Sequence, residues 1–375
     1  MNLEEHAGKG LLAKAGLRVP QGRLVTDKEG ATEAARAFGT VAVKAQVAAG
    51  KRGKAGGIRI AATPDEAAAA ADAILGMTIG GLPVERLLVE EGVAIESEFY
   101  AAVLNDPLSK GPLVLFSTAG GMDVEEIAAE QPASMRRHPV DIRKGFDEGD
   151  ARAMLDGAGL GAEAVGALVP ALAKLYEAYR ANDAELVEVN PLVLTKDGQA
   201  VALDCKLTVD DGAMGRQEGL KDLGVPEPMT DLERRGAELG FRYIELEGDI
   251  GLLANGAGLT MTTMDAVRHH GGRPANFLEI GGESYTKATP ALGLVLSNPG
   301  VKGLLVNFCG AFARTDVMVA GVLDALDALK PDLPIAFSVH GTGEKEAVAM
   351  IEERLGVTPH PSMDDAVKAI VEATR

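Results

Sequence analysis

The sequence contains no tryptophan, and phenylalanine and tyrosine bring the aromatic share to only 4%. Side chains on which nucleic-acid bases could stack are therefore scarce. Basic residues are also outnumbered, because the formal net charge is −18 at pH 7. Such an acidic chain is repelled by a phosphate backbone. Together these shortages argue against a nucleic-acid-binding protein.

Cysteines and long apolar segments are equally scarce. Cys205 and Cys309 are the two cysteines, and their spacing fits neither a metal site nor a disulfide framework. No apolar run is long enough to span a bilayer, and residues 1–10 lack the basic-then-apolar pattern of a signal peptide. We therefore expect a cytoplasmic protein in a reducing compartment, without a membrane partner.

The overall composition predicts a globular protein of more than one domain. The chain has 375 residues, of which 46% are hydrophobic and 25% charged, and it is too long for one small core. Residues 210–233 are rich in glycine, proline and charge, a composition typical of a linker. We therefore predict two domains, at residues 1–228 and 229–375.

The C-terminal half alternates between short apolar runs and amphipathic stretches. The runs lie at 250–255, 275–280, 301–308 and 333–339, with a weaker one at 357–361, and helical patterns begin near residues 260, 285, 314, 343 and 362. Five strands alternating with helices predict a doubly wound α/β domain. We expect the flavodoxin-like strand order, in which the first and third strands are neighbours.

The N-terminal half predicts a mixed α+β architecture. Helical patterns cover 3–15, 28–38, 64–75 and 162–180, and strand patterns cover 41–46, 58–61, 86–93, 99–104 and 113–117. Segments 185–194 and 199–207 flank the tripeptide Lys-Asp-Gly, which predicts a β-hairpin.

A cationic window stands out in this acidic chain. Between Ala34 and Pro64 there is no acidic residue, but there are six basic ones: Arg36, Lys44, Lys51, Arg52, Lys54 and Arg59. Five glycines share the window, and their backbone N–H groups could approach phosphate oxygens while the cations neutralise them. The pattern indicates a polyphosphate-binding loop that is not a P-loop; a solvated flexible loop is the alternative.

The predicted hairpin carries hard oxygen ligands. Glu188 and Asn190 share one face of their strand, because side chains alternate with a period of two. If the loop has three residues with Gly198 left-handed, Asn190 lies opposite Asp204, and both face the basic loop. An amide oxygen and a carboxylate suit Mg²⁺ that bridges phosphates. The alternative is the polar outer face of an ordinary hairpin.

Two loops at the expected ligand-binding edge of the C-terminal sheet contain glycine and open helices. They are Asn255–Gly258 and Gly310–Ala313. Backbone N–H groups at a helix N-terminus can bind an anion, and ligands of doubly wound sheets bind where the strand order reverses. The first loop does not match the dinucleotide fingerprint G-x-G-x-x-G, because Met261 stands in place of the third glycine.

Taken in order, eight segments of the sequence resemble those of succinyl-CoA synthetase β subunits. They are KAQVAAGKRGKAGG (44–57), LLVEEGVAIESEFY (87–100), STAGGMDVEEIA (117–128), LVEVNPLVL (186–194), ALDCKL (202–207), NGAGLTMTTMD (255–265), GGRPANFLEIGG (271–282) and NFCGAFARTD (307–316). The resemblance covers nearly the whole chain. It implies an N-terminal ATP-grasp domain followed by a flavodoxin-like CoA-ligase domain.

The resemblance also implies roles for individual residues. The nucleotide, ATP/ADP with GTP/GDP as the alternative, would be held by Lys44, Arg52, Gly53, Glu90 and Glu98, with Lys51 as an added cation. Asn190 and Asp204 would bind Mg²⁺, and Glu188 would face a phosphohistidine at the nucleotide site as the catalytic residue. Asn255, Gly310, Ala311, Phe312 and Ala313 would receive the carboxylate substrate.

In this family the chemistry is divided between two subunits. The phosphorylated histidine and most of the CoA site belong to an α subunit, in an αβ or α₂β₂ complex. None of the six histidines here, which are His6, His138, His269, His270, His340 and His360, lies in an obvious phosphoryl-carrying loop. The implied reaction is acid + CoA + NTP ⇌ acyl-CoA + NDP + phosphate, with succinate as the first choice, as in the tricarboxylic acid cycle.

Departures from the family pattern leave two alternatives open. Lys51 stands where glycine is usual, Ala119 replaces a glutamate, and residues 310–316 differ from G-G-I-x-R-C-D. One alternative is a ligase for malate or another small dicarboxylate-like acid. The other is a catalytically degenerate nucleotide-binding or regulatory subunit. Lys44, Glu188, Asn190 and Asp204 are all retained, which argues against the latter because a degenerate site has no need for clustered charge.

Overall fold

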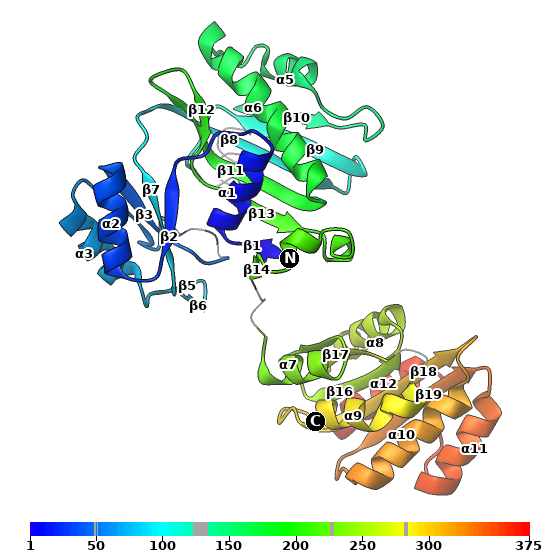
Figure 1. Cartoon of the computed structure of the whole chain (residues 1–375). Helices are drawn as coiled ribbons and strands as arrows, with labels where there is room; N and C mark the ends of the chain where they lie inside the picture. The colour runs from blue at the N-terminus through cyan, green and yellow to red at the C-terminus, as the bar shows by residue number, and fades with distance from the viewer. Residues whose placement is uncertain (49, 51, 123–133, 226–228, 281–283) are drawn as a thin grey trace. The chain divides into compact units, whose positions relative to one another are not determined.

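The computed structural model describes the whole chain except residues 49, 51, 123–133, 226–228 and 281–283. The chain divides into two compact units, Met1–Glu227 and Pro228–Arg375 (Figure 1). Within the described residues, no helix combines the length and the apolar character needed to cross a bilayer.

A large antiparallel sheet organises the first unit. Its order within the described residues is β10-β9-β8-β11-β13-β1-β14, with β12 pairing β11 off this path. The strands are β1 (Asn2–Leu3), β8 (Ile95–Asp106), β9 (Gly111–Ser117), β10 (Met135–Pro139), β11 (Ala184–Thr195), β12 (Ala200–Ala202), β13 (Lys206–Val209) and β14 (Gly224–Val225). The N-terminal strand β1 thus lies between two strands from the end of the unit.

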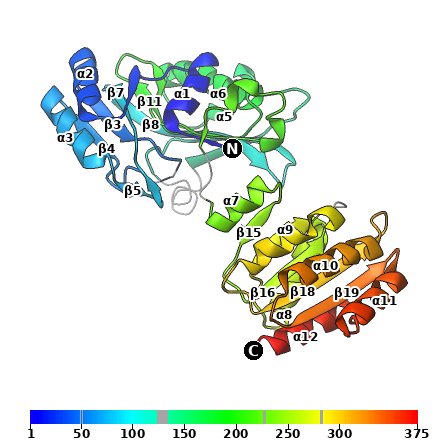
Figure 2. The ribbon, with the colours of Figure 1, turned by 60° about the horizontal axis from the view of Figure 1, so that its bottom comes forward.

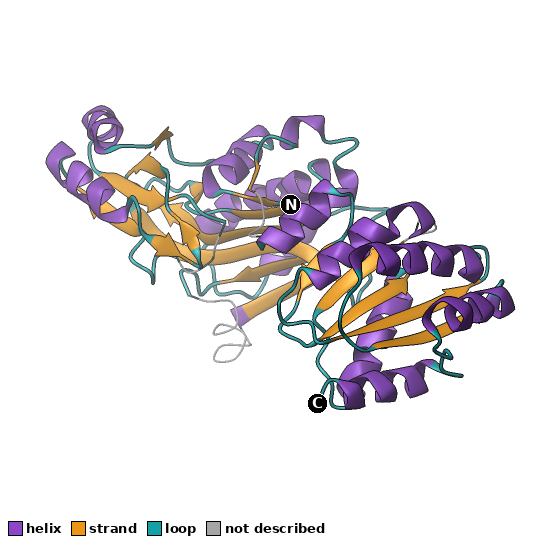
Figure 3. Cartoon of the chain, turned by 90° about the horizontal axis from the view of Figure 1, so that it is seen from below, coloured by secondary structure: helices purple, strands orange, loops and turns teal. Residues whose placement is uncertain are grey.

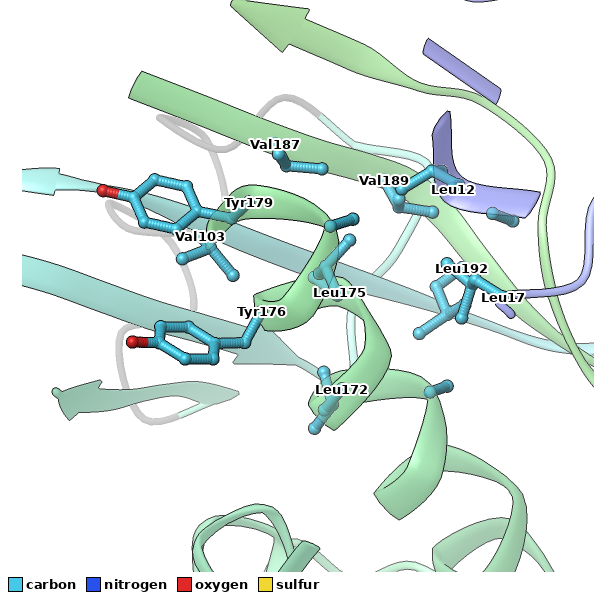
Figure 4. Packing of buried hydrophobic residues seen from close by; sticks show 14 of the residues in the cluster. Leu12, Leu17, Val103, Leu172, Leu175, Tyr176, Tyr179, Val187, Val189 and Leu192 are labelled. Atoms are coloured by element: carbon cyan, nitrogen blue, oxygen red, sulfur yellow. The ribbon is translucent and has the colours of Figure 1, made fainter. Parts of the chain in front are cut away.

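Three helices cover one face of this sheet: α1 (Glu5–Lys14), α5 (Glu148–Leu155) and α6 (Ala162–Ala181) (Figure 1). Figure 4 shows the apolar stripe of α6, including Leu172 and Leu175, against Val187 and Val189 of β11. The stripe follows the helical period and the strand residues alternate, which matches the sequence pattern. Pro170 lies inside α6, as expected from the predicted helix at residues 162–180.

A smaller sheet with the order β2-β7-β3-β4 forms the rest of the first unit. Its strands are β2 (Gly22–Val25), β3 (Val41–Ala45), β4 (Ile58–Ala61) and β7 (Leu87–Glu91); β5 (Thr78–Ile79) and β6 (Leu82–Pro83) form a separate pair. Helices α2 (Lys28–Phe38) and α3 (Pro64–Ile74) pack on it (Figure 2). The side chains of Asp27 and Thr63 cap the first turns of α2 and α3 by accepting hydrogen bonds from backbone N–H groups.

The second unit is a doubly wound domain (Figure 3). The sheet order is β15-β17-β16-β18-β19, in strands β15 (Tyr243–Glu245), β16 (Ile250–Asn255), β17 (Asn276–Ile280), β18 (Gly303–Gly310) and β19 (Ile335–Gly341). Helices α8 (Ala257–His269) and α12 (Met363–Ala373) pack on one face, and α9 (Ser284–Leu296), α10 (Thr315–Leu329) and α11 (Glu344–Leu355) belong to the core on the other. Helix α7 (Asp231–Glu238) precedes β15.

The expected adjacency of the first and third parallel strands is confirmed, because β16 pairs β18 in parallel. The predicted strand at 357–361 is wrong: His360 makes an isolated bridge to Ser338. Prolines at 359 and 361 remove the N–H groups that a ladder needs. The edge of the sheet is instead β15, which runs antiparallel to β17.

Two further sequence expectations need correction. The predicted strand 199–207 is two strands, β12 and β13, with residues 203–205 between them. The predicted linker 210–233 is partly structured: it contains 3₁₀ turns at Asp211–Ala213 and Glu218–Leu220, strand β14, and the start of α7.

Candidate functional site

Six charged side chains meet inside the first unit, and we call them the buried ion cluster: Glu5 and Lys9 of α1, Lys44 of β3, Arg52, Glu90 of β7, and Asp204. Three cations face three carboxylates. The first five residues are between 2% and 8% exposed, whereas the Asp204 side chain is 30% exposed. Buried charges persist when they are paired in this way, and Asp204 is the member that opens toward solvent.

Lys44 is held by partners from three segments. Its Nζ lies 3.0 Å from Glu5 Oε1 and 2.7 Å from Glu90 Oε2, and it donates to the carbonyl of Leu203 at 2.5 Å. Ala42 is the register partner of Glu90, so Lys44 and Glu90 are diagonal neighbours on one face of the sheet. Burial alone would lower the pKa of Lys44, but the carboxylates of Glu5 and Glu90 raise it above its ordinary value.

Arg52 links the cluster to the hairpin. Its Nη1 lies 2.8 Å from Glu5 Oε2 and donates to the carbonyl of Ala45 at 3.0 Å, while its Nη2 lies 2.5 Å from Asp204 Oδ1. Burial opposes the charge of Arg52, yet Glu5 and Asp204 raise its pKa further above the ordinary value. The exposed Gly53 follows in a turn closed by a bond from the Gly56 N–H to the Gly53 carbonyl. Lys51 lies outside the described residues.

Glu5 and Lys9 are the functional candidates that sequence reasoning missed. Lys9 Nζ lies 2.8 Å from Glu5 Oε1 and 2.6 Å from Glu90 Oε1. Burial would raise the pKa of Glu5, but the charges of Lys44, Lys9 and Arg52 hold it well below its ordinary value. One signal in the sequence was Gly8, a residue without a side chain between Glu5 and Lys9. In the structure, a Cβ at this position would lie 2.7 Å from the Cys205 sulfur. Gly8 therefore lets α1 pack closely against the segment between β12 and β13, which carries Asp204.

The hairpin has the predicted geometry. Its loop has three residues, and Gly198 has φ +74°. Leu194 is the register partner of Ala200 and Glu188 that of Lys206, so the unchanged register sets Asn190 opposite Asp204. Asn190 also lies at a β-bulge, where the register of β11 against β8 shifts between residues 189 and 192. Bulges of this kind re-aim side chains near functional sites.

The two hairpin side chains nevertheless engage different loops. Asp204 reaches Arg52, as expected. The Asn190 side chain instead accepts from the Gly121 N–H at 2.8 Å and donates to the Met122 carbonyl at 2.8 Å. In this state Asn190 therefore fastens the loop that follows β9, and the expectation that its amide turns to the basic loop is not met.

Glu188 and Glu98 lie outside the buried ion cluster. Glu188 Oε2 accepts from the Tyr100 hydroxyl at 3.0 Å. Glu98 is exposed on β8, where the glycine pair after β9 packs against it: a Cβ on Gly121 would overlap Glu98 Oε2, and one on Gly120 would overlap the Phe99 backbone. This loop therefore requires glycine at both positions.

In the second unit the two predicted loops lie side by side. The Asn255 side chain donates to the Cys309 carbonyl and accepts from the Cys309 N–H, both at 2.9 Å. A Cβ on Gly310 would overlap the Ala313 carbonyl, so the loop turns tightly there. The Thr342 hydroxyl donates to the Ala311 carbonyl at 2.9 Å. The arrangement brings Asn255 and Gly310–Ala313 together at the carboxyl edge of the sheet.

Phe312 does not narrow a pocket in this unit, because its side chain is fully exposed. The neighbouring Arg314 is held by Asp316, with Nη2 2.9 Å from Oδ2. The hydrogen bond from Arg314 lowers the pKa of Asp316 from its ordinary value. The backbone of the loop, rather than the Phe312 ring, is thus the part placed beside Asn255.

Two family models match the chain in order. One is described as an ATP-grasp domain and matches residues 2–194; the other is described as a CoA-ligase and matches residues 253–371. A solved structure of ATP citrate lyase from Methanothrix soehngenii has the same fold, with a TM-score of 0.76 and 23% identity over 99% of each chain. The fold class expected from the sequence is confirmed.

Curated relatives match over their full length. The chain is 44% identical to the β subunit of an ADP-forming succinate–CoA ligase from Rubrobacter xylanophilus, over 100% of this chain and 99% of the relative. It is 43% identical to the β subunit of a GDP-forming succinate–CoA ligase from Thermus thermophilus, over 99% of this chain and 98% of the relative. Because both domains and the whole length agree, this chain belongs to the family of succinate–CoA ligase β subunits.

Proposed function

We propose that this chain is the nucleotide-binding subunit of an enzyme that catalyses succinate + CoA + ATP ⇌ succinyl-CoA + ADP + phosphate. An α subunit would supply the phosphohistidine and most of the CoA site. The observation that carries the proposal is the buried ion cluster within the ATP-grasp domain, in which Lys44 is held by carboxylates and Arg52 is held cationic beside the partly exposed Asp204. Preorganised cations in a dry site suit a polyphosphate.

Within this proposal the nucleotide site is built around the cluster. Lys44, Arg52, Gly53 and Glu90 would hold the nucleotide, with Lys51 as a further cation. Glu98 would contact the nucleotide from β8. Relatives of nearly equal identity are named ADP-forming and GDP-forming, so a competition between ATP and GTP has to decide the base.

The hairpin residues fit Mg²⁺ by their donor chemistry. The carboxylate of Asp204, in the segment between β12 and β13, and the amide oxygen of Asn190 on β11 are hard ligands at facing positions of the hairpin. Mg²⁺ commonly takes one or two protein ligands and completes its shell with water and phosphate, and no cluster of three or more His, Cys, Asp or Glu side chains suited to a metal occurs in the described residues. The bound ion would neutralise phosphate charge and orient the transferred group.

This chain would then take part in two steps. It would hold the nucleotide for phosphorylation of the partner's histidine, and it would bind the succinate that receives the phosphoryl group next. The partner's histidine takes the terminal phosphoryl group and releases the nucleoside diphosphate, with Glu188 facing the histidine. The succinate carboxylate then takes the phosphoryl group from that histidine, and the CoA thiol displaces phosphate from the acyl phosphate. Splitting a difficult transfer in this way is the usual logic of covalent catalysis.

Asn255 and Gly310–Ala313 would receive the carboxylate in the second unit. The backbone N–H groups of a tight loop that opens α10 are suitable donors for an anion. Succinate follows from the names of the relatives, and the fully exposed Phe312 gives no reason to prefer malate.

We expect the isolated chain to bind Mg-ADP and Mg-ATP but to form no CoA ester. The reason is that the nucleotide site lies within this chain, whereas the phosphoryl-carrying histidine belongs to the partner. Calorimetric titration measures the binding, and chromatography of an overnight incubation with succinate, CoA and Mg-ATP measures the product. The same incubation with an α subunit is the positive control, and CoA-ester formation without that subunit would contradict the two-subunit proposal.

A further inference from the structure

We infer that Glu5 of the N-terminal helix is a positioning residue of the nucleotide site, acting through Arg52. The inference rests on the proposed function, since it takes Arg52 as the residue that meets the phosphates. Neither the cationic window nor the hairpin contains Glu5; it lies about forty residues before Lys44 in the sequence. Its carboxylate nevertheless contacts Lys9, Lys44 and Arg52.

Glu5 sits on an anchored element. The amino group of Met1 donates to the Val209 carbonyl at 2.7 Å, and β1 pairs β13 on one side and β14 on the other. Leu11 and Leu12 bury α1 in the main core. A carboxylate fixed by backbone pairing and core packing can hold a long arginine side chain in one place, which preorganises the arginine.

Counting donors shows which cation is available to a phosphate. An ammonium group has three N–H donors and a guanidinium has five. The partners of Lys44 are Glu5, Glu90 and the Leu203 carbonyl, which occupy all three of its donors. Within the described residues, Arg52 uses one donor for each of Glu5, Asp204 and the Ala45 carbonyl, which are three of five. Arg52 therefore offers the phosphate its remaining donors, and Glu5 sets their direction.

Glu5 and its neighbour Glu4 form a matched pair for a test. Glu4 is also buried, but its Oε2 lies 2.8 Å from Arg86 Nε and 3.3 Å from His6 Nδ1, not beside the cluster cations. The variants are Glu5→Gln, Glu4→Gln, Arg52→Gln and the double variant Glu5→Gln/Arg52→Gln. The dissociation constant of Mg-ADP is measured by calorimetry with the full chain, at a temperature where circular dichroism shows every variant folded.

Loss of a well-aligned charge-assisted contact is worth about tenfold or more in affinity. We therefore expect Glu5→Gln and Arg52→Gln each to raise the dissociation constant at least about tenfold, and Glu4→Gln to leave it within about twofold. Because Glu5 acts through Arg52, adding Glu5→Gln to Arg52→Gln should cost less than about threefold more. A purely structural role would lower the melting temperature of Glu5→Gln without this pattern in affinity.

Two results separate the inference from the proposed function. If Arg52→Gln weakens binding while Glu5→Gln does not, the positioning role of Glu5 is wrong and the nucleotide site stands. If Arg52→Gln leaves binding unchanged, the site itself is wrong and the inference falls with it. Should Glu5→Gln fail to fold, the charge-balanced Glu5→Gln/Lys9→Met takes its place, and wild-type affinity in that variant would overturn the inference.

Discussion

Replacing Asp204 with asparagine is expected to remove most of the gain in nucleotide affinity that Mg²⁺ provides. Asp204 is the partly exposed carboxylate of the buried ion cluster and lies opposite Asn190. Outer-shell partners of a metal are worth about 10–100-fold in affinity, so losing a direct anionic ligand should cost about a hundredfold. Calorimetric titration of ADP into wild type and variant, with Mg²⁺ and with chelator, measures the gain.

The titration with chelator shows whether Asp204 binds the metal or only maintains the structure of the nucleotide site. Without Mg²⁺ the variant should bind ADP as well as wild type or better, because Arg52 loses a carboxylate that competes with phosphate. Asp222→Asn, at an exposed position of the same unit, is the control and should leave both arms unchanged. If the Asp204 variant kept the full Mg²⁺-dependent gain, the assignment of Asp204 as a metal ligand would be refuted.

Lys44→Met is expected to destabilise the first unit at neutral pH by about 3–5 kcal/mol, the cost of leaving buried carboxylates without their partner. Glu5 and Glu90 lie within 3.0 Å of Lys44 Nζ. Lys28→Met is the control, since Lys28 is about half exposed and lies 3.4 Å from Asp72. An exposed pair of that kind contributes about 0–1 kcal/mol. Urea unfolding followed by circular dichroism measures both.

The pH dependence of Lys44→Met has a definite sign. In wild type the pKa of Glu5 is depressed, so its contribution is present above its ordinary value of 4.5 and is lost as pH falls toward the lower folded value. Removing Lys44 raises the pKa of Glu5 in the folded state. The deficit of the variant should therefore be largest near pH 7 and shrink only as pH falls below 4.5 toward the lower folded pKa of Glu5. A deficit that matched Lys28→Met at pH 7 would contradict the buried ion cluster as a source of stability.

The sequence was sufficient wherever local chemistry decides the structure. The tripeptide Lys-Asp-Gly between two apolar strands fixes a three-residue turn with Gly198 left-handed, and the register of Asn190 against Asp204 follows from that turn. The parallel strands of the second unit were equally visible, because strands buried on both faces are continuous apolar runs. The expected strand order made β16 and β18 neighbours, and it therefore predicted that Asn255 lies beside the loop after β18.

The buried ion cluster could not be predicted because it is assembled by tertiary contacts. A glutamate and a lysine four residues apart on a helix, such as Glu5 and Lys9, are normally an exposed pair. Their burial depends on Glu90, 81 residues beyond Lys9, and on the Leu203 carbonyl, 194 residues beyond it. The edge strand β15 was not predicted for a related reason. It has only three residues and takes its structure from pairing with β17.

The central claim is that nucleotide held by this chain drives formation of a CoA ester on a two-subunit enzyme. Its most direct test is succinate-dependent formation of succinyl-CoA by the purified complex of this chain with an α subunit. The wild-type complex should form succinyl-CoA with stoichiometric release of ADP and phosphate, and a complex carrying Arg52→Gln should need at least about tenfold more nucleotide. A wild-type complex that hydrolysed ATP without forming succinyl-CoA, or an Arg52 variant with unchanged nucleotide dependence, would contradict the account.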